Sequence, residues 1–156
     1  MSQSRSRYDS MTVRVGRYTA ILDESVRLLV IDDDPIQREF ASVYLASPSA
    51  EIVTAPSAER GLVELRRERF DLVLVDHEMP GMSGIEFISA VRADDAFFAM
   101  PIIMVTSHED ISTIDRAYQA GATSFATKPV NWRLLSYQIR YVLRAQRLIE
   151  EANGHD

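Results

Sequence analysis

The side chains best suited to chemistry in this sequence each stand directly after a short apolar run. They are four carboxylates, a hydroxyl and an ammonium group, namely Asp32, Asp33, Asp34, Asp76, Thr106 and Lys128. Ligands of open parallel sheets bind beyond the carboxyl ends of the strands. If the apolar runs are parallel strands, these side chains therefore gather at one edge of a sheet.

The carboxylates favour a metal site. Asp32, Asp33 and Asp76 would converge if their strands are neighbours, and like charges that close need a cation or a raised pKa. Oxygen ligands without Cys or His favour a hard ion, and a half-exposed pocket suits Mg²⁺. Alternatively, Asp33 and Asp34 only cap the next helix. That fits Asp34, which precedes Pro35, but not Asp76, which is followed by a turn.

Thr106 and Lys128 favour an anion site beside that metal. A hydroxyl donor and an ammonium group opposite a metal-bound carboxylate suit an anion of about phosphate size. Each has an ordinary alternative, because Thr106 could cap the following helix and Lys128 could be an exposed charge at a strand end. Their placement at the ends of two different strands favours the functional interpretation.

The elements that position these groups follow from the hydrophobic pattern. Short β-branched runs predict buried strands at residues 26–31, 51–55, 71–75, 102–105 and 123–126. Segments with helical spacing lie between them, and the longest runs from 131 to about 151. Asp34-Pro35, Ser83 with Glu86, and Asn131 supply helix-start signals. Five alternating units predict an α/β three-layer sandwich around a parallel sheet.

Composition excludes several classes of protein. The chain has 156 residues, of which 46% are hydrophobic and 26% charged, values typical of one globular domain. The absence of Cys excludes disulfides and thiolate sites. A net charge of −6 argues against general nucleic-acid binding. We expect a cytoplasmic protein without membrane or direct nucleic-acid contacts, because no secretory signal and no bilayer-length apolar run is present.

Four segments, VIDDDP, DLVLVDHEMPGMSG, PIIMVTS and FATKPV, resemble in order the signature segments of the bacterial two-component response-regulator receiver domain. The likeness covers about residues 26–145, and four segments at matching intervals are a specific signal. It implies the doubly wound, flavodoxin-like (βα)5 fold, with a parallel sheet of strand order 2-1-3-4-5.

The resemblance also implies an acceptor and a metal site. Asp76 would accept a phosphoryl group from a sensor histidine kinase or a histidine phosphotransfer protein. Mg²⁺ would be held by Asp33, Asp76 and the main-chain carbonyl of Glu78, and Asp32 would act through water.

Further implied roles concern the phosphorylated state. Thr106 would bond the phosphoryl oxygens, and Lys128, aimed by a cis Lys128–Pro129 peptide, would pair with the new charge. Thr106 and Phe125 would form a switch that changes contacts with a downstream effector protein, on the face of the fourth helix, fifth strand and fifth helix.

The sequence departs from the family pattern at Phe125, where Tyr is frequent, so the switch aromatic lacks a hydroxyl. Glu78 and His108, two residues past the acceptor and past the site threonine, occupy positions that tune self-hydrolysis in this family.

Other functions remain open at this point. A Mg²⁺-dependent phosphatase of the haloacid-dehalogenase kind would use Asp32 and Asp34 as an Asp-x-Asp pair, although Pro35 and the absence of a cap domain fit poorly. A receiver that serves as a phosphorylation-independent scaffold is a third reading, disfavoured by the complete set of site residues.

The domain division is expected to be a partly flexible extension at 1–24, a receiver domain at 25–151 and a tail at 152–156.

The last helix is longer than is needed to cover the sheet, and a second apolar track runs along it: Leu134, Tyr141, Ala145 and Leu148. We expect a homodimer through this track and the face of the fourth and fifth helices. The stretch NWRLLSYQIRYVLRAQR also resembles helices that join receivers to cyclic-di-GMP output domains, and a frayed amphipathic end is the plain alternative.

Overall fold

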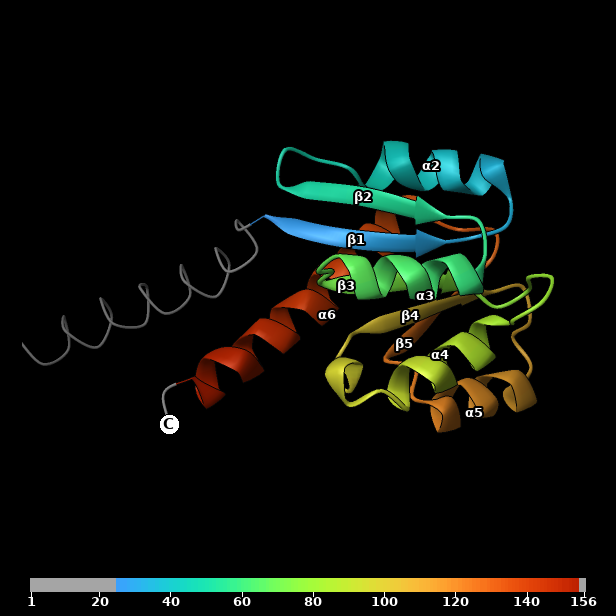
Figure 1. Cartoon of the computed structure of the whole chain (residues 1–156). Helices are drawn as coiled ribbons and strands as arrows, with labels where there is room; N and C mark the ends of the chain where they lie inside the picture. Colours follow the sequence, from blue (N-terminus) through green and yellow to red (C-terminus); the bar gives the residue numbers. More distant parts are fainter. Residues whose placement is uncertain (1–24, 155–156) are drawn as a thin grey trace, which may run out of the picture.

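The computed structural model describes residues 25–154, and its centre is a single five-stranded sheet (Figure 1). All strand pairs are parallel, and the order is β2-β1-β3-β4-β5, as expected. The strands are β1 (Val26–Ile31), β2 (Ala50–Ala55), β3 (Leu72–Asp76), β4 (Ile102–Thr106) and β5 (Ser124–Thr127).

Helices cover both faces of the sheet, which confirms the three-layer sandwich (Figure 1). They are α2 (Pro35–Leu45), α3 (Ala58–Arg67), α4 (Gly84–Arg92), α5 (Ile111–Ala120) and α6 (Trp132–Asn153), with a short 3₁₀ turn η1 (Asp95–Phe97) before β4. Helices α2 and α6 pack on one face, and α3, α4 and α5 pack on the other.

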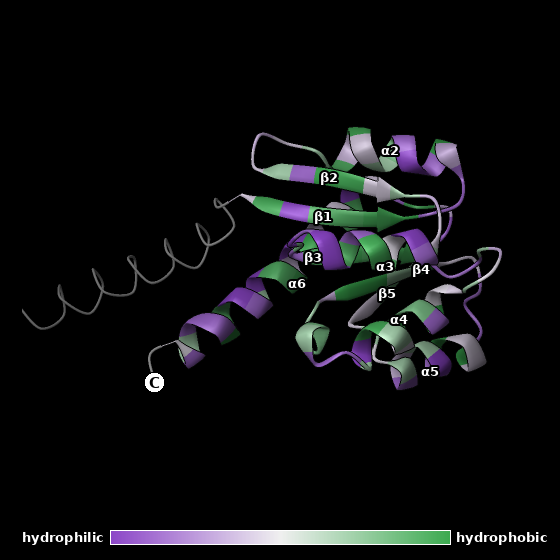
Figure 2. Cartoon of the chain, in the orientation of Figure 1, coloured by the Kyte–Doolittle hydropathy of each residue, from purple (hydrophilic) through white to green (hydrophobic). Residues whose placement is uncertain are grey.

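The core is split by the sheet into two apolar layers. On β1, Leu29 and Ile31 pack toward α3 and α4, whereas Leu28 and Val30 pack toward α2 and α6. Because both faces of the central strands are buried, residues 28–31 of β1, 72–75 of β3 and 102–105 of β4 form continuous apolar runs. The carboxyl-terminal half of β1 and most of β4 accordingly appear green in Figure 2. Each fully buried Leu or Ile side chain contributes roughly 1.5–3 kcal/mol to folding. This rigid layer fixes the strand ends that carry the polar side chains.

The predicted helix-start signals are confirmed. Asp34 accepts a hydrogen bond from the main-chain N–H of Ile36, Asn131 caps α6, and Ser83 and Glu86 form a reciprocal capping box at α4. These caps satisfy backbone donors that would otherwise lack partners at the helix ends.

Four of the five strands differ by one residue from the predicted ranges: β2 begins one residue earlier, β4 ends one residue later, and β3 and β5 are each shifted by one residue. Strand β3 begins after Asp71, because that carboxylate accepts a hydrogen bond from the main-chain N–H of Arg27. It extends to Asp76, which pairs with Val105 of β4. Strand β5 likewise begins at Ser124 and ends at Thr127.

The extension expected at residues 1–24 lies outside the described residues. Within residues 25–154, no helix is long and apolar enough to cross a bilayer.

Helix α6 is long, with 22 residues. Its first three turns pack against one face of the sheet, where Leu135, Ile139 and Leu143 are buried. At about 1.5 Å per residue the helix measures about 33 Å. Its last turns therefore run past the body of the domain (Figure 1).

Candidate functional site

Three carboxylates meet at the carboxyl edge of the sheet, as the sequence predicted. Asp32 and Asp33 follow β1, and Asp76 ends the adjacent strand β3. One ligand oxygen from each lies within 4.8 Å of the others. Asp76 and Asp32 are buried, whereas Asp33 is exposed.

The acid cluster is poorly neutralised by the protein itself. Burial raises the pKa of Asp76 to about 7, and the negative charge of Asp32 adds to the effect, while the hydrogen bond from Lys128 opposes it. Burial also raises the pKa of Asp32. The cluster therefore needs a proton or a cation at neutral pH, and an all-oxygen donor set of this size fits a hard divalent ion such as Mg²⁺.

Lys128 is in place beside the buried acid. Its ammonium Nζ lies 2.8 Å from Asp76 Oδ1, across the sheet from β5 to β3. Burial of Lys128 lowers its pKa, but the hydrogen bond to Asp76 and the nearby negative charges of Asp76, Asp32 and Glu78 together outweigh that effect, and the net pKa is raised. The Lys128–Pro129 peptide bond is cis, as expected. The exposed-charge alternative for this lysine is therefore wrong.

Thr106 is fully buried at the end of β4, and its hydroxyl is not a helix cap. The hydroxyl donates to Glu78 Oε1 at 2.6 Å and accepts the main-chain N–H of His108 at 3.0 Å. Helix α5 is capped instead by Asp110, which accepts from the N–H of Thr113. The capping alternative for Thr106 is wrong, because Asp110 stands closer to the start of that helix.

The side chain of Glu78 occupies the centre of the donor set, which the sequence did not reveal. Its Oε1 accepts hydrogen bonds from Thr106 and from both the N–H and the hydroxyl of Ser107 at 2.6–3.1 Å. Its Oε2 lies 3.8 Å from Lys128 Nζ. Burial opposes ionisation, but the hydrogen bonds, led by the one from Thr106, lower the pKa of Glu78 to about 2.

These groups form a preformed anion-binding site, which the carboxylate of Glu78 occupies. An ionised carboxylate sits between a hydroxyl, a main-chain N–H and an ammonium group. Charge-assisted hydrogen bonds of this kind are roughly twice as strong as neutral ones. The sequence predicted Thr106 and Lys128 as hydrogen-bond donors to an anion. It did not indicate that Ser107 joins them or that the carboxylate of Glu78 occupies the site.

The loop after β3 approaches the acid cluster closely. Glycine at position 84 is required here, because a Cβ atom would lie 2.6 Å from the carbonyl oxygen of Asp76. The N–H of Gly84 donates to the carbonyl of His77, and the N–H of Glu78 donates to Asp76 Oδ1 at 3.2 Å. The turn thus holds residue 78 beside the carboxylate of Asp76.

The expected switch residue Phe125 lies on β5 with 42% of its surface exposed. Gln138 of α6 donates to the carbonyl of Phe125 at 2.9 Å and to the hydroxyl of Ser124 at 2.6 Å. This link between β5 and α6 was not anticipated from the sequence.

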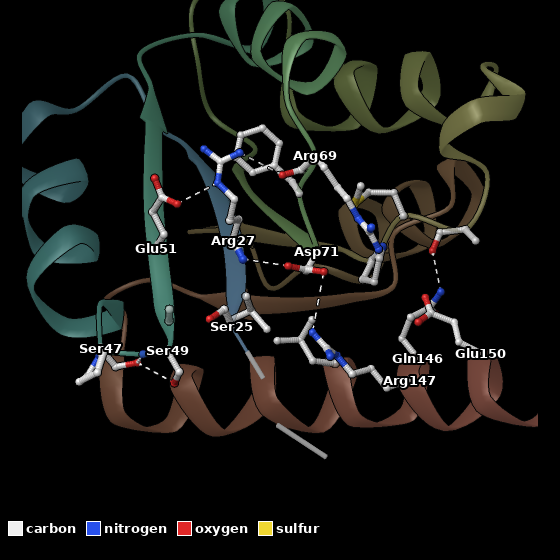
Figure 3. Close-up of a pocket in the computed structure, with 18 of the residues that line it drawn as sticks. Ser25, Arg27, Ser47, Ser49, Glu51, Arg69, Asp71, Gln146, Arg147 and Glu150 are labelled. Carbon is white, nitrogen blue, oxygen red and sulfur yellow. Dashed lines mark hydrogen bonds and ion pairs between the residues drawn. The ribbon is translucent and has the colours of Figure 1, made fainter. Parts of the chain in front are cut away.

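A separate cleft of about 1030 Å³ lies at the opposite, amino end of the strands (Figure 3). Two of its arginines lie in ion pairs: Arg27 Nε lies 3.0 Å from Glu51, and Arg147 lies 3.9 Å from Asp71. None of the predicted site residues lines it. The cleft is therefore distinct from the acid cluster.

A doubly wound parallel sheet with paired acids, a buried hydroxyl and a lysine at its carboxyl edge defines a receiver-type domain. The chain belongs to this family: the model of the response regulator receiver domain matches residues 28–140. The heme response regulator HssR of Staphylococcus aureus is 34% identical over 119 residues, 76% of this chain. The chain matches about half (52%) of that relative's length.

Solved receiver structures agree with this assignment. The chemotaxis protein CheY4 of Vibrio cholerae is 30% identical, with a TM-score of 0.72 over 76% of this chain and 98% of that chain. A CheY-like receiver protein of Methanospirillum hungatei is also 30% identical, with a TM-score of 0.74 over 80% and 98%. The chain is thus a receiver domain of two-component response regulators, a signalling module.

Proposed function

We propose that this chain is the phospho-acceptor of a two-component phosphorelay and that Asp76 is the acceptor residue. The observation that carries the proposal is the 2.8 Å contact between Lys128 and Asp76 Oδ1 within a cluster of three carboxylates. A buried carboxylate with an adjacent acid pair and a fixed ammonium is equipped for phosphoryl transfer, which needs positioning and charge stabilisation above all.

The proposed reaction is an in-line displacement. An oxygen of Asp76 attacks the phosphorus of a phosphohistidine, the new O–P bond forms, and the P–N bond breaks to release the imidazole. Lys128 and the N–H of Glu78 hold Oδ1, which leaves the second oxygen for the incoming phosphorus. The phosphohistidine would come from a sensor histidine kinase or a histidine phosphotransfer protein, in the cytoplasm.

Asp33, Asp76 and the carbonyl of Glu78 would hold Mg²⁺, with Asp32 acting through water. When bound, the ion neutralises charge that builds up on the transferring phosphoryl oxygens. Asp33 suits a direct ligand because it is exposed, whereas an oxygen of Asp32 already accepts the N–H of Asp34 at 2.9 Å.

The phosphorylated state would rearrange the donors around Thr106. The new phosphoryl oxygens compete with Glu78 for the same hydroxyl, N–H and ammonium groups. Movement of Thr106 toward them would allow Phe125 to turn inward and change the α5–β5–α6 face offered to an effector protein. His108, 3.7 Å from Glu78, stands where it can affect the lifetime of that state.

The phosphatase alternative has little structural support. Asp34 is engaged as the cap of α2, accepting from the N–H of Ile36 at 2.9 Å, and it is not among the converging carboxylates. Turnover of p-nitrophenyl phosphate with Mg²⁺ separates the two functions. Multiple turnovers that vanish in Asp32→Asn but survive in Asp76→Asn would identify a phosphatase. Our proposal expects no more than the slow turnover of a self-hydrolysing acceptor, and its loss in Asp76→Asn.

A further inference from the structure

Helix α6 carries an apolar stripe on the side that faces away from the sheet. The buried residues Leu135, Ile139 and Leu143 define its inner side. At 100° per residue, an uncharged set of side chains lies on the opposite side. It comprises Leu134, Tyr137, Tyr141, Ala145, Leu148 and Ala152. Leu134 and Tyr141 are 64% and 61% exposed. These six residues form the outer stripe of α6.

The outer stripe has the spacing of a coiled-coil seam. From Tyr141 its members follow at intervals of four, three and four residues, through Ala145 and Leu148 to Ala152. That spacing keeps a seam turned toward one partner helix. The seam lies on the side of α6 that faces away from the domain body, whereas Leu143, Gln146 and Arg147 on the inner side still contact that body. The last turns of α6 extend beyond the body (Figure 1), so a second helix can approach the outer side without meeting the sheet.

We propose that the occupant of this stripe is α6 of a second copy of the chain, running antiparallel over residues 141–152. In this register every layer of the seam joins a large side chain to a small one. Tyr141 meets Ala152 of the second copy, and Leu148 meets Ala145 of the second copy. By two-fold symmetry each pairing occurs twice, so each of the four layers joins a large side chain to a small one, which favours interdigitated packing.

Charge complementarity supports the same register. Arg144 and Glu151 lie on one flank of the outer stripe, one residue before Ala145 and Ala152. In the antiparallel register, Arg144 faces Glu151 of the second copy, and this pairing also occurs twice. On the other flank, Ile149, which is 57% exposed in the single chain, faces the outer edge of Val142 of the second copy, a side chain that also packs partly on its own core.

A parallel pairing fits the same side chains poorly. It would place Tyr141 against Tyr141 and Ala145 against Ala145, which alternates crowded layers with empty ones. It would also leave Arg144 facing Ile149 rather than an acid. The sequence of the stripe therefore selects the antiparallel orientation.

The dimer is expected to be weak and concentration-dependent, because four layers bury less than the ~1,200–2,000 Å² of a standard stable interface. It goes beyond the proposed phospho-acceptor function, and its formation does not require phosphorylation. Its test therefore has to report orientation directly as well as mass.

The chain contains no cysteine, so engineered cysteines give an unambiguous report. Tyr141→Cys and Ala152→Cys are prepared separately and oxidised alone or mixed. The antiparallel register puts these positions level in the mixture, whereas two copies of position 141 lie about 16 Å apart along the axis. A disulfide needs Cα atoms within about 7 Å. We expect a cross-linked dimer in the mixture and monomers in each sample alone; self-cross-linking of either variant would overturn the orientation.

A charge exchange in the full chain provides the second measurement, by sedimentation equilibrium. Arg144→Glu should weaken association roughly fivefold, and addition of Glu151→Arg should restore it. Arg133→Glu, the same charge change on α6 outside the overlap, is the control and should have no effect. A monomer at all concentrations, a dimer that persists with Leu148→Glu, or association that appears only after removal of residues 1–24 would each overturn the proposal.

Discussion

The hydroxyl of Thr106 donates a 2.6 Å hydrogen bond to Glu78 Oε1, so the predicted phosphoryl-binding threonine is already engaged by an acid of its own chain. The same oxygen of Glu78 accepts a hydrogen bond from the main-chain N–H of Ser107. Glu78 thereby occupies the donors that a phosphoryl group would need. On the proposed function, Glu78 would therefore compete with the phosphoryl group, and phosphorylation would have to displace its side chain.

Removal of this competitor should speed phosphorylation. Glu78→Ala frees the Thr106 hydroxyl and the Ser107 N–H and leaves the carbonyl of residue 78 in place. We expect the rate with phosphoramidate to rise by roughly 10-fold, the equivalent of one charge-assisted hydrogen bond. Glu86→Ala, which removes an acid of the α4 capping box, is the matched control. An unchanged or lower rate in Glu78→Ala would show that Glu78 does not compete.

Asp76→Asn should stabilise the metal-free protein at neutral and higher pH. The folded pKa of Asp76, about 7, lies above its ordinary value of 3.8, because ionisation is costly in this buried cluster. The stabilising contribution of the neutral acid is complete below pH 4 and is lost as pH rises through 7. The gain in unfolding free energy from the substitution should therefore grow to about 2–4 kcal/mol at pH 8.

Thermal unfolding between pH 4 and pH 8 measures this gain. Asp115→Asn, on the exposed side of α5, is the control and should show no such pH trend. Millimolar Mg²⁺ should reduce the difference, since the ion neutralises the wild-type cluster alone. A gain that is constant with pH would contradict the assignment of the raised pKa to Asp76.

Metal affinity should depend more on Asp33 than on Asp32. Asp33 is exposed and can reach the ion directly, whereas Asp32 is buried and already accepts the N–H of Asp34. The single tryptophan, Trp132, lines the same small cavity as Asp32 and Asp76, so its fluorescence can follow a Mg²⁺ titration. Equal losses in Asp33→Ala and Asp32→Ala, or a larger loss in the latter, would refute this order.

The strand ends were predictable from the sequence because they depend on local pattern. The apolar runs, which are buried on both faces of the sheet, place Asp76 and Thr106 at the ends of neighbouring strands. Asp34 directly before Pro35 likewise indicates a helix N-cap. The side-chain placement of Glu78 was not predictable, since it depends on a contact across 28 positions to Thr106. A motif gives the spacing of such residues but not the rotamer that joins them.

Phosphorylation should strengthen self-association through β5 and α6. Gln138 of α6 donates a hydrogen bond to the carbonyl of Phe125. An inward movement of Phe125 would therefore be transmitted to the helix. A coupling free energy of about 1–3 kcal/mol would tighten the dimer about 5- to 150-fold. Light scattering with and without acetyl phosphate measures it, and Gln138→Leu should reduce the response without abolishing phosphorylation. An equal response in that variant would exclude this route.

The central claim is that Asp76 accepts a phosphoryl group with the help of Mg²⁺, and mass spectrometry of the intact chain tests it most directly. After incubation with acetyl phosphate and Mg²⁺, wild type should gain the mass of one phosphoryl group, which is lost on treatment with hydroxylamine. Chelation of Mg²⁺ should abolish the gain. Asp76→Asn should show none, and Asp115→Asn should behave as wild type. Labelling of Asp76→Asn at the wild-type rate would contradict the account.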